Sequence, residues 1–376
     1  MDVEFHYYMT YLIAARAGFV PKDAQTLAFA SQAVDDNKIR CRITDGAHNF
    51  YENPLSQTMD ITKPAEVLYH IYPVFHFVPW CGIRDRSVIS PSARIDNEES
   101  DKEITSPNNL LAQKMMQNAL DLPETDESRI YRIGIAAHAY VDTWAHQNFI
   151  GRKSPLNQIP TPKCIDTKDP TSTKEYCVEN LLDTGHGAFG HSPDIPNNVW
   201  DDPRLIVSRV NNRERFLDAA RHLFWLLLKD RDQHATKTFI QNNVDALLKD
   251  LNEDIGSECS TKTQRIKNYC RRAMSSEYGS EALPIYDEEN ISWAQEAILE
   301  TWSGLIKEVQ ERLCVDIGGL FQKSPIDCQW AQPLEYKRSD WYKFLEAVKA
   351  HQEAGTAILK EHKIVPSSPS HSVGQA

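Results

Sequence analysis

Apolar residues recur at the spacing typical of helices over most of this 376-residue chain, and glycine or proline interrupts the pattern. Gly18 is a usual C-terminal signal for the first such segment, and Pro21 fits the first turn of the second. We find no alternation that indicates a sheet and no internal repeat. The sequence therefore predicts an all-α, mainly helical protein. The helical segments are 3–17, 21–37, 108–120, 127–150, 201–230, 235–251, 288–313 and 334–362.

The segments between these helices are of three kinds. Residues 67–80 are apolar, but Pro73 and Pro79 divide them, which predicts a broken helix or an extended piece. Residues 37–62 and 82–107 are polar and predict loops. Residues 152–201 contain six prolines, and they would form a long ordered loop if metal or disulfides organise them.

The composition is that of a globular protein. Hydrophobic residues make up 41% and charged residues 25%, and no run approaches the roughly 18 apolar residues of a membrane span. The N-terminal stretch does not resemble a secretory leader, so we expect a protein that is cytoplasmic at synthesis. Lys and Arg number 41 against 53 acidic residues, and the net charge of −12 argues against stable binding to nucleic acid or to an anionic membrane.

Six of the eight cysteines fall into locally spaced pairs. We interpret them as reduced structural thiols because no export signal is visible, whereas oxidised pairs would indicate leaderless export. The pairs are Cys164 with Cys177, Cys259 with Cys270, and Cys314 with Cys328.

Ten of the 13 histidines lie between residues 6 and 234, which places the candidate chemistry in the first two thirds of the chain. His138, Asp142 and His146 follow one another at intervals of four on a predicted helix. Each interval rotates the side chain by only about 40°, so all three share one face. Two imidazoles and a carboxylate at this spacing suit a first-row metal, and the carboxylate can bridge two ions. The alternative is a face of buried histidines that hydrogen-bond to neighbours.

Three further candidate residues lie on the first two predicted helices. Asp35 and Asp36 end a helix rich in alanine, where carboxylates oppose the helix dipole, and a bound cation would offset that cost. His6 lies among tyrosines on the first helix, where it could equally belong to the core.

Other candidates come from less regular segments. His76 is flanked by phenylalanines, and such apolar surroundings suit a neutral ligand imidazole. The glycine-rich stretch DTGHGAFGHSPD contains His186, His191 and Asp194, and its glycines allow several side chains to converge on one point. The same stretch is also compatible with a polar surface loop.

Together these pieces resemble the zinc-dependent phospholipase C and single-strand nuclease superfamily, which consists of mainly helical enzymes with a three-metal site. The likeness covers about residues 1–200. Met1 stands where those enzymes have a processed tryptophan whose free amine binds metal, so the sequence is similar to a bacterial branch more than to either named enzyme. The residues that carry the likeness are His6, QAVDD at 32–36, HF at 76–77 and HAYVDTWAHQNF at 138–149.

The resemblance implies a set of metal ligands drawn from all these candidates. One ion would be bound by Asp35 or Asp36 together with His76, His138 and Asp142. Asp142 would also bridge to an ion held by His6, and a third ion would take His146 and the later loop. The implied ligands are His6, Asp35, Asp36, His76, His138, Asp142, His146, His186, His191 and Asp194.

Such a site implies a hydrolase that cleaves phosphodiester bonds through a water activated by two or three divalent ions, with zinc as the expected metal. Asp35, Asp36 and Asp142 are the expected catalytic carboxylates, and the substrate would be a lipid head group, an oligonucleotide or a small diester. Two alternatives stay open. One is an HD-type phosphohydrolase, although the chain contains no adjacent His-Asp dipeptide. The other is a non-catalytic, metal-stabilised binding protein.

The same reasoning predicts how the chain is organised. Residues 1–234, including the loop 152–201, would form the metal-binding catalytic core. Residues 235–364 would form a helical part packed on that core, and residues 365–376 a flexible tail.

Overall fold

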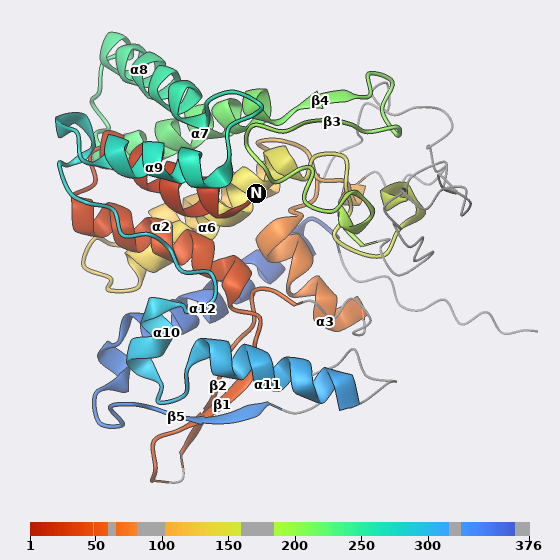
Figure 1. Ribbon diagram of the computed structural model, residues 1–376, viewed down its shortest axis with the longest axis vertical. Coiled ribbons are helices and arrows are strands. Elements are labelled where there is room, and N and C mark those ends of the chain that lie inside the picture. Colours follow the sequence, from red (N-terminus) through yellow and green to blue (C-terminus); the bar gives the residue numbers. More distant parts are fainter. Residues whose placement is uncertain (48, 59–64, 81–101, 159–183, 316–324, 365–376) are drawn as a thin grey trace, which may run out of the picture.

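The computed structural model describes residues 1–47, 49–58, 65–80, 102–158, 184–315 and 325–364, without the side chains of 65–66 and 309–315. Most of these residues are helical, which confirms the expected mainly helical class (Figure 1). The α-helices are α1 (Thr10–Arg16), α2 (Pro21–Asp36), α3 (Ala65–Tyr69), α5 (Leu110–Leu120), α6 (Arg129–Ala145), α7 (Asn212–Arg231), α8 (Lys237–Ile255), α9 (Lys262–Ala273), α10 (Ser292–Ala297), α11 (Trp302–Val315) and α12 (Asp340–Glu361).

Short helical segments of other kinds flank these helices. Two are π-helical, η1 (Glu4–Met9) and η2 (Tyr72–His76), and η1 runs directly into α1. π-Helical turns are frequent at functional sites. The 3-10 turns are η5 (Pro155–Asn157), η6 (Gly187–Phe189), η7 (Ser276–Tyr278) and η8 (Tyr336–Arg338).

The expectation that the chain contains no sheet is wrong. A three-stranded sheet has the order β2-β1-β5, with β1 antiparallel to β2 and parallel to β5, and β3 pairs with β4 in a separate hairpin. Each strand is only three or four residues long, so the alternation of buried and exposed side chains is too short to stand out in the sequence. The strands are β1 (Cys41–Thr44), β2 (Phe50–Glu52), β3 (Val199–Asp201), β4 (Arg209–Asn211) and β5 (Ile326–Gln329).

Several helices end or begin at other residues than expected. α6 stops at Ala145 rather than 150, because Asn148 adopts φ 76° and its N–H donates to the carbonyl of Thr105. The segment 201–230 is helical only from Asn212, after the β3–β4 hairpin. The predicted helix 288–313 is two helices, and α9 was not predicted.

Two cysteines that are far apart in the sequence have neighbouring thiols. Cys328 lies on β5, beside the β1 strand that carries Cys41, and both thiols are buried. A hydrogen bond with the Cys328 thiol, together with burial, raises the pKa of the Cys41 thiol. The structure describes free thiols at Cys41, Cys259, Cys270 and Cys328. Cys164, Cys177 and the side chain of Cys314 lie outside the described part of the chain, so the predicted pairs that include them are not described.

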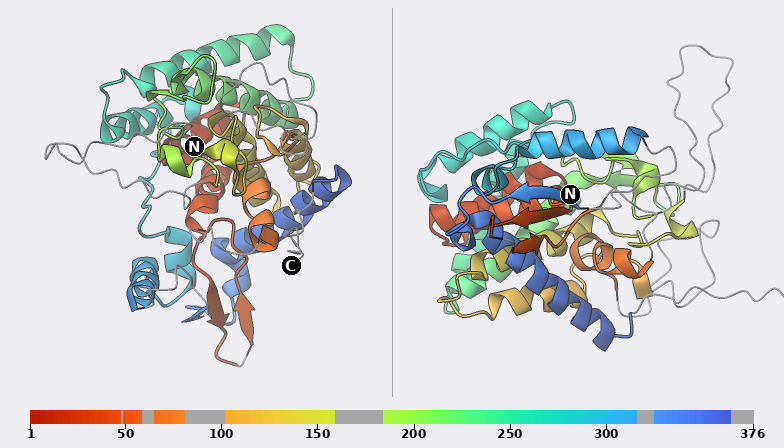
Figure 2. Two further views of the ribbon diagram at one scale, coloured as in Figure 1. Left: turned by 90° about the vertical axis from the view of Figure 1, so that its right-hand side faces the viewer. Right: turned by 90° about the horizontal axis from the view of Figure 1, so that it is seen from below.

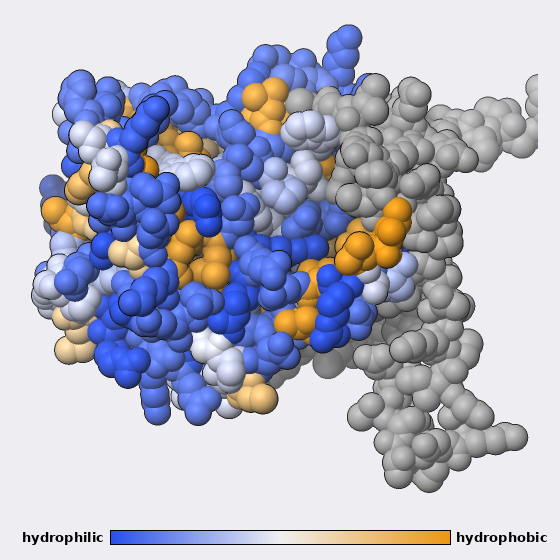
Figure 3. All heavy atoms as spheres, turned by 90° about the horizontal axis from the view of Figure 1, so that it is seen from above, coloured by the Kyte–Doolittle hydropathy of each residue, from blue (hydrophilic) through white to orange (hydrophobic). Residues whose placement is uncertain are grey.

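Residues after 234 pack on the earlier helices and share their hydrophobic core. α12 packs against α5 and α6, α8 packs against α7, and β5 completes the sheet begun by β1 (Figure 2). The predicted tail 365–376 lies outside the described residues. The face shown in Figure 3 is mainly hydrophilic, with small hydrophobic patches. Among the described helices, none combines the length and apolar character that crossing a bilayer requires.

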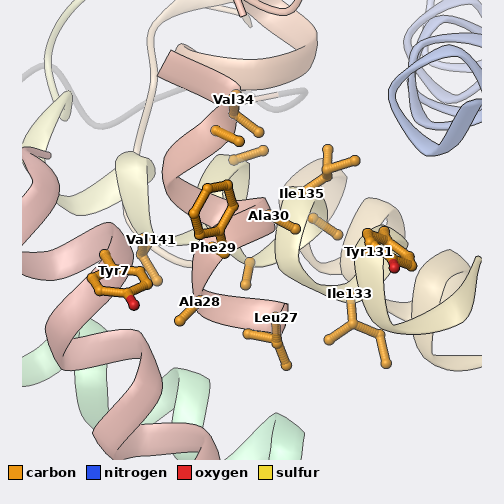
Figure 4. Packing of buried hydrophobic residues seen from close by; sticks show 14 of the residues in the cluster. Tyr7, Leu27, Ala28, Phe29, Ala30, Val34, Tyr131, Ile133, Ile135 and Val141 are labelled. Atoms are coloured by element: carbon orange, nitrogen blue, oxygen red, sulfur yellow. The ribbon is translucent and has the colours of Figure 1, made fainter. Parts of the chain in front are cut away.

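α2 and α6 cross in unusually close contact at the centre of the molecule (Figure 4). A Cβ placed on Gly134 of α6 would lie 2.3 Å from the carbonyl oxygen of Leu27 and 2.8 Å from the Cβ of Ala30. One turn along the same contact, the imidazole of His138 donates to the carbonyl of Ser31 over 2.8 Å. The absence of a side chain at position 134 therefore sets the separation of the two helices.

Gly134→Ala is expected to lower the free energy of unfolding by about 1–3 kcal/mol, because the added methyl group must push two packed backbones apart. Chemical denaturation measures the change. Gly304→Ala on the exposed side of α11 is the control, since its Cβ would meet only the Thr301 side chain, whose hydroxyl accepts from the Gly304 N–H, and not a packed neighbouring backbone. Equal stability of Gly134→Ala and the wild type would show that the crossing is not tightly packed.

Candidate metal centre

Asp142 is the centre of a cluster of imidazoles. Its carboxylate lies on α6 and is only 1% exposed. Four imidazole nitrogens lie close to its oxygens. The distances are 3.2 Å for His6 Nε2, 3.5 Å for His76 Nδ1, 3.4 Å for His138 Nε2 and 3.4 Å for His146 Nδ1. The two remote histidines come from the π-helical segments η1 and η2, so the fold converges on one carboxylate from three parts of the chain.

A second carboxylate, from the last turn of α2, faces the same imidazoles. Asp35 Oδ1 lies 3.7 Å from both His76 Nδ1 and His138 Nε2, and Asp35 Oδ2 lies 3.9 Å from His6 Nε2. The Asp35 side chain is 26% exposed, so it forms an open edge of the cluster. Two groups of possible cation ligands result, His6–Asp35–His138 and His76–His138–Asp142.

A third group lies beyond the end of α6. His146 Nε2 is 3.3 Å from Asp194 Oδ1, and His186 Nε2 is 3.4 Å from Asp194 Oδ2. These three residues also form a set that could hold a cation. Gly185 places His186 there, because its φ of 57° and the absence of a Cβ let the loop pass against the ring of Phe77.

Two residues of the predicted ligand set lie elsewhere, and the prediction is corrected for both. Asp36 points away from the cluster and accepts hydrogen bonds from Gln32 Nε2 at 3.0 Å and Tyr286 Oη at 2.9 Å. Successive residues on a helix point about 100° apart, so only one carboxylate of the Asp35–Asp36 pair can face the imidazoles. His191 is exposed, and its backbone carbonyl accepts from the N–H of Asp194.

The amino group of Met1 is a member of the cluster that sequence reasoning did not identify. It is buried, donates to Asp142 Oδ1 and lies 3.3 Å from Asp194 Oδ1. Burial alone would lower the pKa of this amine, but the carboxylates of Asp142, Asp194 and Asp35 outweigh it and raise the pKa to about 11. The resemblance offered a signal for it, since a free terminal amine binds metal in the enzymes that the sequence resembles, but Met1 was not included in the predicted ligand set.

Backbone carbonyls fix the tautomers of four imidazoles. A carbonyl oxygen can only accept a hydrogen bond, so the ring nitrogen facing it carries the proton. The other nitrogen of each neutral ring then has a lone pair directed at the cluster. The four donations are His76 Nε2 to Ser56 at 2.9 Å, His138 Nδ1 to Ser31 at 2.8 Å, His146 Nδ1 to His76 at 2.8 Å, and His186 Nδ1 to Gly190 at 2.8 Å.

The remaining lone pairs face one another or face carboxylates. His76 Nδ1 and His138 Nε2 are 3.2 Å apart, and both are the unprotonated nitrogens of their rings. Both ring nitrogens of His6 and the Oδ2 atom of Asp142 are buried and have no hydrogen-bond partner in the described part of the chain. Such an arrangement is unfavourable unless protons or cations lie between the ligand atoms. The donor set therefore fits bound divalent cations.

Burial favours the neutral form of three imidazoles, and neighbouring positive charges favour the ionised form of the central carboxylate. Burial lowers the pKa of His6 and of His138, and it lowers the pKa of His186 to about 4. For Asp142, burial would raise the pKa, but His146, the Met1 ammonium and the other imidazoles outweigh it and hold the pKa well below its usual value. Burial raises the pKa of Asp35 to about 7.

Fold and cluster together define a mainly helical protein with a candidate multinuclear metal centre. The chain belongs to a family described as "Family of unknown function (DUF6765)", whose profile matches residues 1–359. That range includes both the candidate ligands and the C-terminal helices. A search of curated proteins and a search of solved structures find no match.

The two neighbouring aspartates at the end of α2 allow a direct test of the cluster. Asp35→Asn is expected to weaken zinc binding about 10-fold or more, because an amide replaces a charged ligand oxygen. Asp36→Asn is expected to leave zinc binding unchanged. Calorimetric titration of both metal-free variants with zinc measures the difference. If the two substitutions weakened binding equally, Asp35 would have no special place in the centre.

Proposed function

We propose that this protein is a metal-dependent hydrolase that cleaves phosphodiester bonds with two or three bound divalent ions, zinc being the best match. The observation that carries the proposal is the set of unprotonated imidazole nitrogens directed at the buried carboxylate of Asp142. Neutral imidazoles and carboxylates are the ligands that zinc prefers when cysteine is not involved. The resemblance of the motifs to the phospholipase C and nuclease superfamily supports the same activity.

The candidate ligands would be shared among three ions. His76, His138 and Asp35 would share the first ion with Asp142, and Asp142 would bridge to a second ion beside His6. The Met1 nitrogen contacts Asp142 and lies 3.3 Å from Asp194, and it would have to release a proton to bind an ion, as metal binding generally requires of its ligands. His146, His186 and Asp194 would hold the third.

The chain's own residues supply orientation, access and proton transfer. Bound divalent ions lower the pKa of water and polarise a phosphoryl oxygen. The carbonyls of Ser31 and Ser56 fix the rings of His138 and His76, so these ligands need not reorganise. Asp35 and His186 are the more exposed of the ligands, at 26% and 20%, and we assign the approach of substrate to their side. Asp35 lies at the exposed edge of the cluster, so it could accept a proton from water if it did not bind the first ion.

Metal analysis and hydrolysis assays test the proposal together. The purified protein is expected to contain two or three zinc equivalents and to hydrolyse bis(4-nitrophenyl) phosphate, with loss of activity in a chelator and recovery on adding zinc. Parallel assays with phosphatidylcholine micelles and with a single-stranded oligonucleotide separate the substrate classes.

Two results would contradict parts of this proposal. Protein that takes up no divalent ion at neutral pH would refute the metal centre. Protein that binds zinc and is stabilised by it, but cleaves none of the three substrates, would favour the non-catalytic, metal-stabilised alternative.

A further inference from the structure

Arg204 is buried although it lies in the loop that joins β3 to β4. Its residue exposure is 1%, and its guanidinium forms a two-pronged ion pair with Asp202, with Nε–Oδ1 and Nη2–Oδ2 distances of 2.9 and 2.7 Å. The backbone N–H of Arg204 also donates to Asp202 Oδ1 over 3.0 Å. A buried ion pair of this kind needs excellent geometry and further hydrogen bonds to offset its desolvation, so its position is tightly fixed.

The guanidinium connects this hairpin to the end of the metal-binding helix. Nη1 donates to the carbonyl of Asn148 at 3.2 Å and to the carbonyl of Leu156 at 3.0 Å. Asn148 lies two residues after His146, in the turn that follows α6. The same guanidinium lies 3.9 Å from the centre of the Phe149 ring, which is within the range of a cation–π contact.

The guanidinium also reaches the loop that carries the other two ligands of the third group. Its carbon lies 4.7 Å from the centre of the Phe189 ring, in the turn between His186 and Asp194. Phe189 and Phe149 meet edge to face at 5.4 Å, and Phe149 contacts the ring of His186 at 5.9 Å. One buried cation thus contacts both segments that bring ligands to the third group.

We infer that Arg204 and Asp202 are positioning residues that assemble the third cation site, His146–His186–Asp194, and this inference rests on the proposed metal-dependent function. The site needs such a support because α6 has already ended at Ala145, and the loop from 184 to 194 contains only a single 3-10 turn. His146 is still anchored as the C-cap of α6, through its N–H to the carbonyl of Asp142, so the support matters most for the loop that carries His186 and Asp194.

The other two groups of ligands have independent supports. His6, His76, His138 and Asp35 lie on η1, η2, α6 and α2, and backbone carbonyls of other segments orient two of their rings. The contacts described for Arg204 go instead to the turn after α6, to Leu156, to Phe189 and to Asp202. Loss of the pair is therefore expected to remove one ion and to leave the others bound.

The experiment compares zinc content among variants of the full chain. Arg204→Gln and the double variant Asp202→Asn/Arg204→Gln are expected to bind one zinc fewer than the wild type, as is His186→Gln, or to bind the last equivalent at least about 10–100-fold more weakly. The double variant leaves no unpaired buried charge, so it serves if Arg204→Gln does not fold. Arg204→Lys is expected to restore little, because a lysine cannot form the two-pronged pair.

Arg209→Gln is the matched control. Arg209 and Asp201 also form an ion pair on the same hairpin, at 3.2 Å, but both side chains are more than 60% exposed. Hydrogen exchange of the metal-free proteins gives a second readout that does not depend on metal. Residues 184–194 should exchange faster in the Arg204 variants than in the wild type and in Arg209→Gln.

The outcomes separate this inference from the proposed function. A wild type without zinc would refute the metal centre, and hydrogen exchange would then decide on the positioning role alone. Arg204 variants with full zinc content and wild-type exchange would refute the inference while leaving the metal centre intact. Folded Arg204 variants that lose every ion would also refute it, because the pair would then support the whole centre rather than one site.

Discussion

Replacement of Asp142 by Asn is expected to remove at least two of the bound ions and to lower phosphodiester hydrolysis by roughly 10³-fold or more. Asp142 faces four imidazoles and the Met1 amine, so its loss affects two neighbouring groups at once. A multinuclear centre supplies several kcal/mol of transition-state stabilisation, and each 1.36 kcal/mol corresponds to a factor of ten in rate. Zinc analysis and initial rates at saturating substrate measure both effects.

Asp254→Asn is the matched control for this substitution. Asp254 is also a buried carboxylate, at 2% exposure, but its partner is Arg272 on α9, at 2.9 Å. This control is expected to lower stability without changing zinc content. If Asp142→Asn kept the zinc content of the wild type, the central role of this carboxylate would be wrong.

Removal of the bound ions by a chelator is expected to lower the melting temperature strongly at neutral pH. A ligand at 1,000 times its Kd stabilises the folded state by about 4 kcal/mol for each site, and several sites add to the effect. Differential scanning calorimetry with and without chelator measures the difference. A melting temperature that chelator leaves unchanged, in protein shown to contain zinc, would contradict a centre built into the folded core.

The increase in melting temperature that the bound ions cause is also expected to become larger as the pH rises from about 5 to 8. The raised pKa values of Asp35, about 7, and of the Met1 amine, about 11, mean that protons occupy these groups at low pH and compete with cations. His186, with a pKa of about 4, is already neutral over this range and does not compete. A chelator-dependent shift in melting temperature that did not grow with pH would argue against Asp35 and Met1 as ligands.

The metal-free protein is expected to lose stability as the pH falls from about 6.5 towards 4. Burial holds the pKa of His6, His138 and His186 below the value in the unfolded chain, so the unfolded state takes up more protons in this window. Asp35 acts in the opposite direction, because its raised pKa favours the folded state below about 7. Outside the cluster, burial also lowers the pKa of His351 to about 3 and raises the pKa of Asp2, Glu4, Asp36 and Asp254. The contribution of the cluster's histidines is therefore measured by thermal unfolding in chelator of the wild type and of His186→Gln at several pH values, and His186→Gln is expected to lose less stability over this range.

Much of the site could be read from local spacing. His138, Asp142 and His146 were identified because an interval of four residues fixes their common face, whatever the rest of the chain does. The choice between Asp35 and Asp36 could not be made in this way, since it depends on which side of α2 faces α6. His191 was included for a related reason, because a glycine-rich loop does not reveal which of its histidines turns inward.

The fold was also predicted only in part. The helices with long apolar patterns were found, including α2 and α5, whereas β1 and β5 were missed. These two strands are four residues long and pair across more than 280 positions of the chain. Pairing over such a distance is a property of the packed molecule and has no local signal.

The sequence by itself determined the helical class, the candidate ligand residues, and the placement of His138 and Asp142 on one face of α6 with His146 at its end. Only the tertiary structure decided that His6 and His76, which the resemblance had implied, meet Asp142, that the Met1 amine joins them, and that Asp35 rather than its neighbour faces them. The physical reason is the range of the forces involved. Helical periodicity is set by backbone geometry within a few residues, whereas convergence on one carboxylate depends on how closely α2 and α6 pack at Gly134 and on what the buried Arg204 holds together.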